Sequence, residues 1–116
     1  MKKFKRSKRV GDQIHHEVSN ILFRNIKDPA LDLVTITGTK VTDDLRHAIV
    51  FYSVIGDENR WKEVRTGLER SKSYIRKQLS SNLKMKYMPD LKFVEDKTLE
   101  SGDRIDKILS EIDKQF

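Results

Sequence analysis

Apolar residues near the N-terminus recur at intervals of three and four, which is the spacing of one face of an amphipathic helix. Asp28-Pro29 follows this run, and proline disfavours helical geometry in the residue before it and cannot donate to a continuing helix. The spacing therefore predicts a helix from Arg6 to Asn25 that ends before the proline. Its apolar face consists of Val10, Ile14, Val18, Ile21 and Leu22.

Two runs rich in β-branched residues come next, at residues 33–37 and 47–54. Such residues favour β-strands because they pack well on a pleated surface. The connection at residues 42–46, Thr-Asp-Asp-Leu-Arg, is short and rich in turn formers. The two runs are therefore expected to pair as a β-hairpin.

The apolar residues of the first strand do not keep to one face. Successive side chains of a regular strand point to opposite faces of the sheet, so Val34 and Ile36 would lie on one face and Val41 on the other. A β-bulge inserts one extra residue into a strand and so restores the face of the residues that follow it. We therefore expect a bulge at Gly38.

Helical spacing returns after residues 56–59, Gly-Asp-Glu-Asn, which supply a break and a helix N-cap. The apolar face has one polar gap, at Ser71, and the hydroxyls of Ser71 and Ser73 can bond back to carbonyls one turn earlier, which bends helices. We expect two helices that meet at a kink near Ser71-Lys72-Ser73, the second ended by Pro89. The apolar positions are Trp61, Val64, Leu68, Ile75, Leu79 and Leu83.

The rest of the chain predicts a third strand at Leu91–Glu95 and a short C-terminal amphipathic helix built on Ile105, Ile108, Leu109 and Ile112. The order is αββααβ plus that helix, which indicates an α+β fold with a three-stranded sheet and helices on one face. A length of 116 residues suits one compact domain. We expect a basic tail at residues 1–8, the domain at 9–97 and a helical extension at 98–116.

The net charge of +6 is unevenly distributed. Residues 1–10 contain six lysines and arginines and no acid, residues 60–90 have a net charge of +6, and residues 28–59 have a net charge of −4. Nucleic acid is the natural partner of such basic blocks, because each neutralised phosphate releases counterions. The candidate RNA-binding residues are Lys5, Arg6, Lys8, Arg9, Arg46, Arg65, Arg70, Lys72, Ser73, Arg76, Lys77, Lys84 and Lys86.

Other chemistry lacks support in the sequence. His15 and His16 are adjacent on a helix, so their side chains diverge and do not suit one metal ion. Asp43 and Asp44 lie in the hairpin connection, where aspartate favours turn hydrogen bonds over acid–base catalysis. No nucleotide-binding or hydrolase motif occurs. We expect no catalytic residue, metal, cofactor or small-molecule substrate, and core packing for Trp61, Tyr74 and Tyr52.

The chain has no cysteine, as expected for a protein of a reducing compartment such as the cytoplasm. Its basic N-terminus is followed by GDQIHHEVSN, so the apolar region of a secretory signal is missing. No apolar run is long enough to span a membrane. A soluble cytoplasmic protein without a membrane partner is expected.

The order αββααβ resembles the type II KH fold, an RNA-binding module whose GxxG loop clamps nucleic-acid backbone. No two glycines of this chain are three residues apart, so that loop is absent. A KH-like chain without GxxG resembles the bacterial ribosome-binding factor A family, and the match spans nearly the whole length. The pieces that carry the resemblance are residues 9–29, residues 41–48 running into 51–54, Tyr74-Ile75-Arg76 with Leu79, Pro89-Asp90-Leu91, and residues 102–109.

The resemblance implies a factor that binds the immature small (30S) ribosomal subunit, contacts its 16S ribosomal RNA and assists late maturation of that RNA, often with importance in the cold. It implies binding without catalysis, and we expect a monomer. The family's kink usually reads Ala-x-Gly, whereas this chain has Ser71, Lys72 and Ser73, so a side chain occupies space near the backbone. The alternatives are a general single-stranded RNA-binding protein and a metal-dependent nuclease using Asp43, Asp44 and a histidine.

Overall fold

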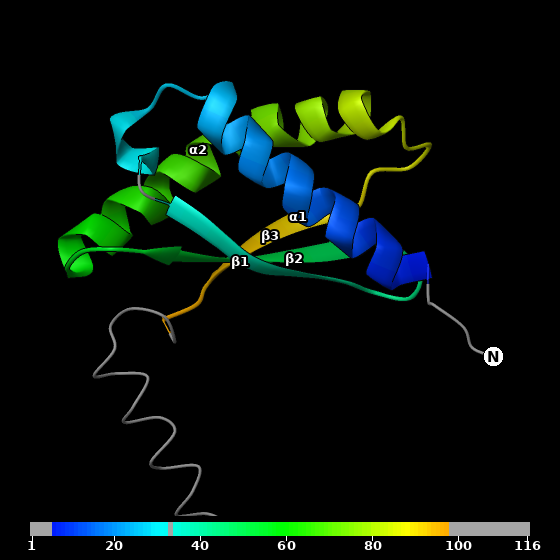
Figure 1. Ribbon diagram of the computed structural model, residues 1–116, viewed down its shortest axis with the longest axis horizontal. Coiled ribbons are helices and arrows are strands. Elements are labelled where there is room, and N and C mark those ends of the chain that lie inside the picture. The colour runs from blue at the N-terminus through cyan, green and yellow to red at the C-terminus, as the bar shows by residue number, and fades with distance from the viewer. Residues whose placement is uncertain (1–5, 33, 98–116) are drawn as a thin grey trace, which may run out of the picture.

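The computed structural model describes residues 6–32 and 34–97, which form two layers (Figure 1). Two long helices lie on one face of a three-stranded sheet, so the predicted α+β class and the placement of helices on one face are confirmed. The predicted C-terminal helix and Lys5 lie outside the described residues. The elements are α1 (Arg6–Arg24), the 3-10 helix η1 (Pro29–Leu31), β1 (Val34–Val41), β2 (His47–Val54), α2 (Glu58–Leu83) and β3 (Asp90–Glu95).

The sheet has the strand order β1-β2-β3. β1 pairs with β2 in the antiparallel sense, as the predicted hairpin requires, and β3 runs parallel to β2 after the crossover through α2. The β1–β2 register shifts between Ile36 and Gly38, so Thr37 is the extra residue of a bulge. The predicted bulge is confirmed, and it lets both Ile36 and Val41 face the core.

The core lies between the sheet and the two helices. All five apolar residues of the predicted stripe on α1 are buried, and β2 contributes Ala48, Val50, Tyr52 and Val54. The rings of Tyr52 and Trp61 lie 5.9 Å apart between centroids, and burial raises the pKa of Tyr52 to about 12. The expected core positions of Tyr52 and Trp61 are confirmed. Tyr74 is 41% exposed, so the same expectation was wrong for this residue.

α2 is one continuous helix of 26 residues, and the predicted division into two helices is wrong. Serine leaves the main-chain N–H in place, unlike proline, so Ser71 and Ser73 do not interrupt the hydrogen-bond ladder. The ribbon of α2 nevertheless changes direction along its length (Figure 1). The predicted N-cap is confirmed, because the Asp57 side chain accepts a hydrogen bond from Arg60 N, and Lys84 ends the helix in a left-handed conformation.

The connection between α1 and β1 is a docked segment rather than a plain loop. Asp28 caps η1 by accepting a hydrogen bond from Ala30 N at 3.0 Å, and Pro29 begins this short helix. η1 packs on α2 at Gly67, where an added Cβ atom would lie 3.0 Å from Leu31 Cδ2 and 3.6 Å from Ala30 Cβ. Glycine therefore permits a close approach that a side chain would obstruct.

Candidate nucleic-acid interface

The four arginines of α2 are all bonded to neighbouring elements. Arginine suits this role because its planar guanidinium offers several donors in a fixed arrangement. Each arginine makes at least one contact with a segment that lies twelve or more residues away in sequence. The arginines are Arg60, Arg65, Arg70 and Arg76.

Arg60 and Arg70 hold the segment around η1 against α2. Arg60 donates to the Pro29 carbonyl and, at 2.5 Å, to the Asp32 carbonyl. Arg70 lies 2.5 Å from the Asp28 carboxylate, and its hydrogen bond, together with the one from Ala30 N, lowers the pKa of Asp28. These two arginines flank Gly67, so the same stretch of α2 both admits η1 and fastens it.

Arg65 of α2 contacts the C-terminal end of β3. Its guanidinium donates two hydrogen bonds to Glu95, at 3.0 and 2.6 Å, and these bonds raise the pKa of Arg65. The side chain is about half exposed but its charge is matched by the carboxylate. Arg65 therefore ties the end of the sheet to α2.

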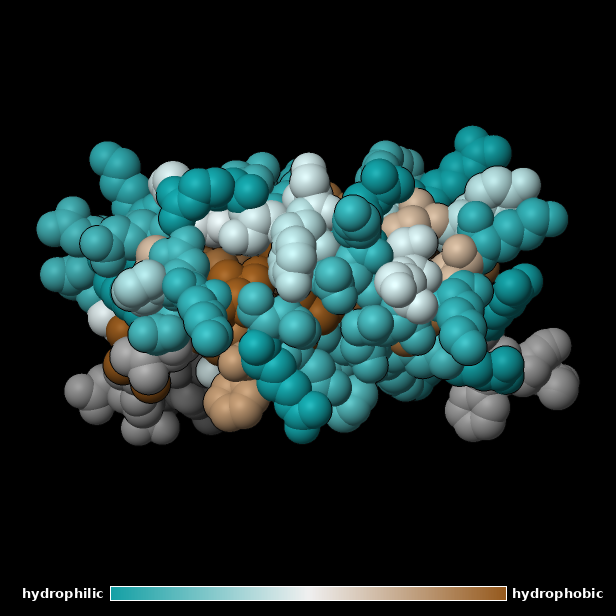
Figure 2. Space-filling view, turned by 90° about the horizontal axis from the view of Figure 1, so that it is seen from above, coloured by the Kyte–Doolittle hydropathy of each residue, from teal (hydrophilic) through white to brown (hydrophobic). Residues whose placement is uncertain are grey.

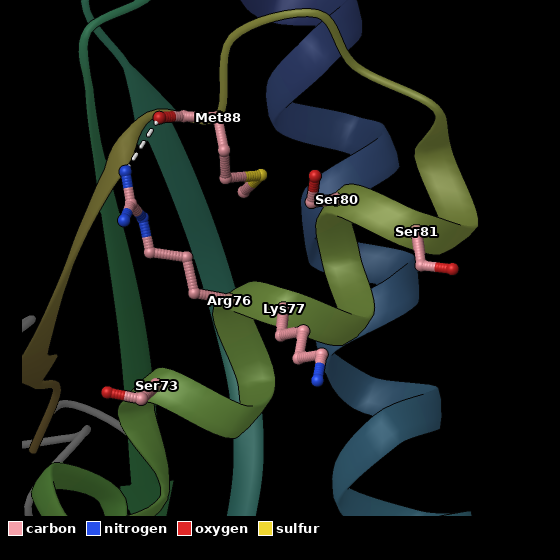
Figure 3. A pocket seen from close by; sticks show the side chains of 6 residues that line it. All are labelled: Ser73, Arg76, Lys77, Ser80, Ser81 and Met88. Atoms are coloured by element: carbon pink, nitrogen blue, oxygen red, sulfur yellow. Dashed lines mark hydrogen bonds between the residues drawn. The ribbon is translucent and has the colours of Figure 1, made fainter.

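Arg76 ties α2 to the start of β3. It donates to the Pro89 carbonyl at 3.2 Å and to the Met88 carbonyl at 3.0 Å, and it lies 3.3 Å from the Asp90 carboxylate. The donor to Met88 is visible in Figure 3, where the Arg76 side chain points away from that of Lys77. Arg76 thus satisfies backbone carbonyls that precede the strand.

Lys77 belongs to a different surface. Ser73, Lys77 and Ser81 are exposed and recur every four residues along α2, which places them on one face of the helix, and the exposed Lys84 caps the end of that helix. Neither lysine makes a hydrogen bond or an ion pair with any residue in the ranges 6–32 and 34–97. These four residues are called the serine–lysine face below.

A surface cavity of about 500 Å³ lies at this face (Figure 3). Hydroxyls and an ammonium are the donors that commonly bind phosphate oxygens. The cavity is lined by Ser73, Arg76, Lys77, Ser80, Ser81 and Met88.

A second group of cations gathers at the end of the molecule where α2 finishes. Ser7 of α1 donates to Asp43 at 3.3 Å, and Asp90 N donates to the Arg46 carbonyl at 2.9 Å. These bonds bring the first turn of α1, the hairpin connection and the start of β3 to the same end (Figure 1). The cations on these segments are Arg6, Lys8, Arg9 and Arg46, and Lys86 lies in the loop that leads into β3.

Two exposed tyrosines lie near cations of the two groups, Tyr74 on α2 near Lys77 and Tyr87 beside Lys86. Tyr74 lies three residues before Lys77, and Tyr87 is 76% exposed, with the Lys86 ammonium 5.6 Å from its ring centroid. Tyr87 could not be predicted from the sequence, because no periodic pattern covers the α2–β3 loop. Seen from the helical side, the surface is mostly hydrophilic, and hydrophobic residues show mainly between polar ones near its middle (Figure 2).

Of the thirteen predicted residues, the twelve that the structure describes do not form one surface. Ser73, Lys77 and Lys84 share the serine–lysine face, while Arg65 and Arg70 are occupied by Glu95 and Asp28. Lys72 is partly buried and has no ion pair with the described residues, and Lys8 lies 3.5 Å from Asp12. Sequence periodicity could separate these faces, but it could not identify the partners of the arginines.

Asp44 serves the hairpin turn, as predicted, whereas Asp43 bonds to α1 instead. Asp44 accepts hydrogen bonds from the Thr42 hydroxyl at 2.6 Å and from Arg46 N at 3.0 Å, and these bonds lower the pKa of Asp44. Asp43 accepts from Ser7. No group of three histidines or carboxylates suited to a metal ion occurs in the part of the chain that the structure describes. Nor is any described helix long and apolar enough to cross a membrane.

Comparison with known proteins gives consistent matches. The ribosome-binding factor A from Geobacter metallireducens is 44% identical over 109 residues, which cover 94% of this chain and 92% of that protein. The crystal structure of ribosome-binding factor A from Thermus thermophilus has a TM-score of 0.66 at 19% identity, covering 77% of this chain and 94% of the other. At this low identity, the structural match shows a shared fold alone.

A third match is a Thermus thermophilus ribosome-binding factor A homology model that was fitted into a cryo-EM map of a complex with 30S. It has a TM-score of 0.57 at 17% identity and covers 82% of this chain and 96% of the other. The model of the family described as ribosome-binding factor A matches residues 6–109. The chain therefore belongs to the ribosome-binding factor A family.

Proposed function

We propose that this protein binds the immature small ribosomal subunit through 16S ribosomal RNA and assists late maturation of that RNA. The observation that supports this most is the serine–lysine face, where Lys77 and Lys84 are unpaired among the described residues while the arginines of the same helix are engaged. A Thermus thermophilus relative is known in a complex with 30S, which supports the choice of subunit.

The proposed contact is to the RNA backbone rather than to a particular base sequence. Lys77 and Lys84 supply charge for phosphates, and the hydroxyls of Ser73 and Ser81 supply hydrogen bonds. Tyr74 provides an exposed ring beside them on which an unpaired base can stack. Backbone contact and stacking together favour RNA of a particular shape. The shape of the ribosomal RNA is what changes as the subunit matures.

The protein acts in this proposal as a monomer in the cytoplasm and by differential affinity. A binder shifts an RNA between two conformations only as far as it prefers one of them. Preference for the immature conformation would therefore hold the subunit in a state that processing enzymes can act on, and a mature subunit would release the factor.

We also propose that the protein has no catalytic activity of its own. Asp43 and Asp44 are the carboxylate pair that a nuclease would need, and both accept hydrogen bonds that build the hairpin end of the molecule. Incubation of labelled RNA with magnesium or manganese should leave it intact. Cleavage that is lost in Asp43→Asn would instead establish a nuclease.

Sedimentation with purified subunits tests the proposed partner. The protein should pellet with precursor small subunits at lower concentration than with mature ones, because only the precursor offers the preferred conformation. An excess of unrelated single-stranded RNA should compete poorly. Equal retention on both subunits would contradict the preference for precursors, and full competition by unrelated RNA would favour a general RNA-binding protein.

A further inference from the structure

The face of the sheet that points away from the helices carries a regular pattern of side chains. One row across the strands consists of Lys40, Ile49 and Lys92, which are directly paired in the register. The next row consists of Gly38, Phe51 and Val94. Ile49, Phe51 and Val94 are only partly buried and do not belong to the core between sheet and helices. An apolar patch is thus flanked by two exposed lysines.

Gly38 leaves this patch hollow on one side. A Cβ atom built at Gly38 would lie 3.9 Å from Phe51 Cδ2, with no closer neighbour, so the glycine is not needed to avoid a clash. Because Gly38 has no side chain, one side of the Phe51 ring is left uncovered by β1. Beyond this row the Thr37 hydroxyl donates to Asp96 at 2.7 Å and Ser53 is buried, so polar residues bound the patch on that side.

We propose that residues 98–116 of this chain dock on this apolar patch, with Ile105, Ile108, Leu109 and Ile112 against Ile49, Phe51 and Val94. The four aliphatic residues recur at helical spacing, which gives one apolar stripe of the kind that a flat sheet face accepts. The patch is mainly aliphatic, which suits these residues better than it suits stacked bases. This inference does not depend on the proposed function.

Charge and chain length support the same occupant. Residues 98–116 contain five acidic and three basic residues, and the patch is flanked by Lys40 and Lys92. Asp106 and Asp113, seven residues apart, would border one side of a helical stripe. Lys97 is only three residues beyond Val94, and residues 98–104 extend to about 23 Å when fully stretched. A tethered segment at this distance has a high effective concentration at the patch.

Cross-linking in the full chain tests the proposal, since the protein has no native cysteine. The double variant Lys92→Cys with Asp106→Cys is treated with a short bismaleimide and should give an intramolecular product. Adding Leu109→Asp should lower the yield about tenfold, because leucine loses its burial on the patch. Adding Ser110→Asp, the same charge on the polar side of the stripe, should leave the yield unchanged.

Several outcomes would overturn the proposal. If Leu109→Asp and Ser110→Asp had equal yields, the product would reflect random collisions of a tethered segment. Cross-linked dimers would assign the patch to a second copy of the chain, and no product at all would mean that the segment does not reach it. Photo-cross-linking of Phe51 to bound RNA would assign the face to bases.

Discussion

At the scale of single residues, the main division is between arginine and lysine on α2. Arg60 and Arg76 each satisfy two backbone carbonyls, a task that the forked guanidinium performs better than a single ammonium. Lys77, one position after Arg76, makes no such contact with the described residues. Composition counts these side chains alike, yet their positions give them different roles.

Gly67 shows how one residue sets a distance between elements. Gly67→Val should lower the free energy of unfolding by about 1–3 kcal/mol, because the new side chain would press on Leu31, 3.0 Å from the position of its Cβ. Urea denaturation measures the effect. Gly38→Ala is the matched control, since its Cβ has 3.9 Å of room, and an equal loss in both variants would contradict the packing argument.

Asp28 should make stability depend on pH. Its pKa is lowered from the usual 3.8 by Arg70 and by Ala30 N, so its contribution is fully present well above pH 3.8 and is lost as the pH falls through the lower native-state value. Asn at this position keeps a capping oxygen but has no charge for Arg70. The stability difference between wild type and Asp28→Asn should therefore shrink in acid. Urea midpoints between pH 2 and 7 measure it, and a pH-independent difference would contradict this account.

At the scale of elements, the sequence predicted most of the fold. The parity change at Gly38 located the bulge, and Asp57 located the start of α2, because both signals are local. The division at Ser71 failed, since serine hydroxyls can bend a helix without breaking its ladder. η1 and the partners of the arginines were missed, because contacts such as Arg70–Asp28 join residues 42 apart, which no local pattern encodes.

The junction between α2 and β3 should depend on Arg76 for stability. Arg76→Gln removes donors to the Met88 and Pro89 carbonyls, so the free energy of unfolding should fall by about 1–2 kcal/mol. Lys77→Gln is the adjacent control and should leave stability within about 0.5 kcal/mol of wild type. Thermal and urea denaturation measure both. A larger loss in Lys77→Gln would mean that its ammonium has a structural partner.

At the scale of the whole molecule, the net charge of +6 is divided between structural and accessible cations. Several arginines are matched by carboxylates, while Lys77, Lys84 and the cations near the start of α1 face outward. The affinity of a basic protein for RNA depends on how many phosphates it neutralises rather than on its total charge. Accessible lysines should therefore set the salt dependence of binding.

The most direct test is the salt dependence of binding to precursor small subunits for wild type, Lys77→Gln and Lys62→Gln. Lys62 is an exposed lysine of the same helix that lies eleven residues, about 16 Å along the helix, before Ser73. It is therefore remote from the serine–lysine face, and both variants lose the same charge. Lys77→Gln should reduce the slope of log affinity against log salt by about 1, and Lys62→Gln should leave it unchanged. An unchanged slope in Lys77→Gln, or equal reductions in both variants, would contradict the claim that the serine–lysine face binds the RNA backbone.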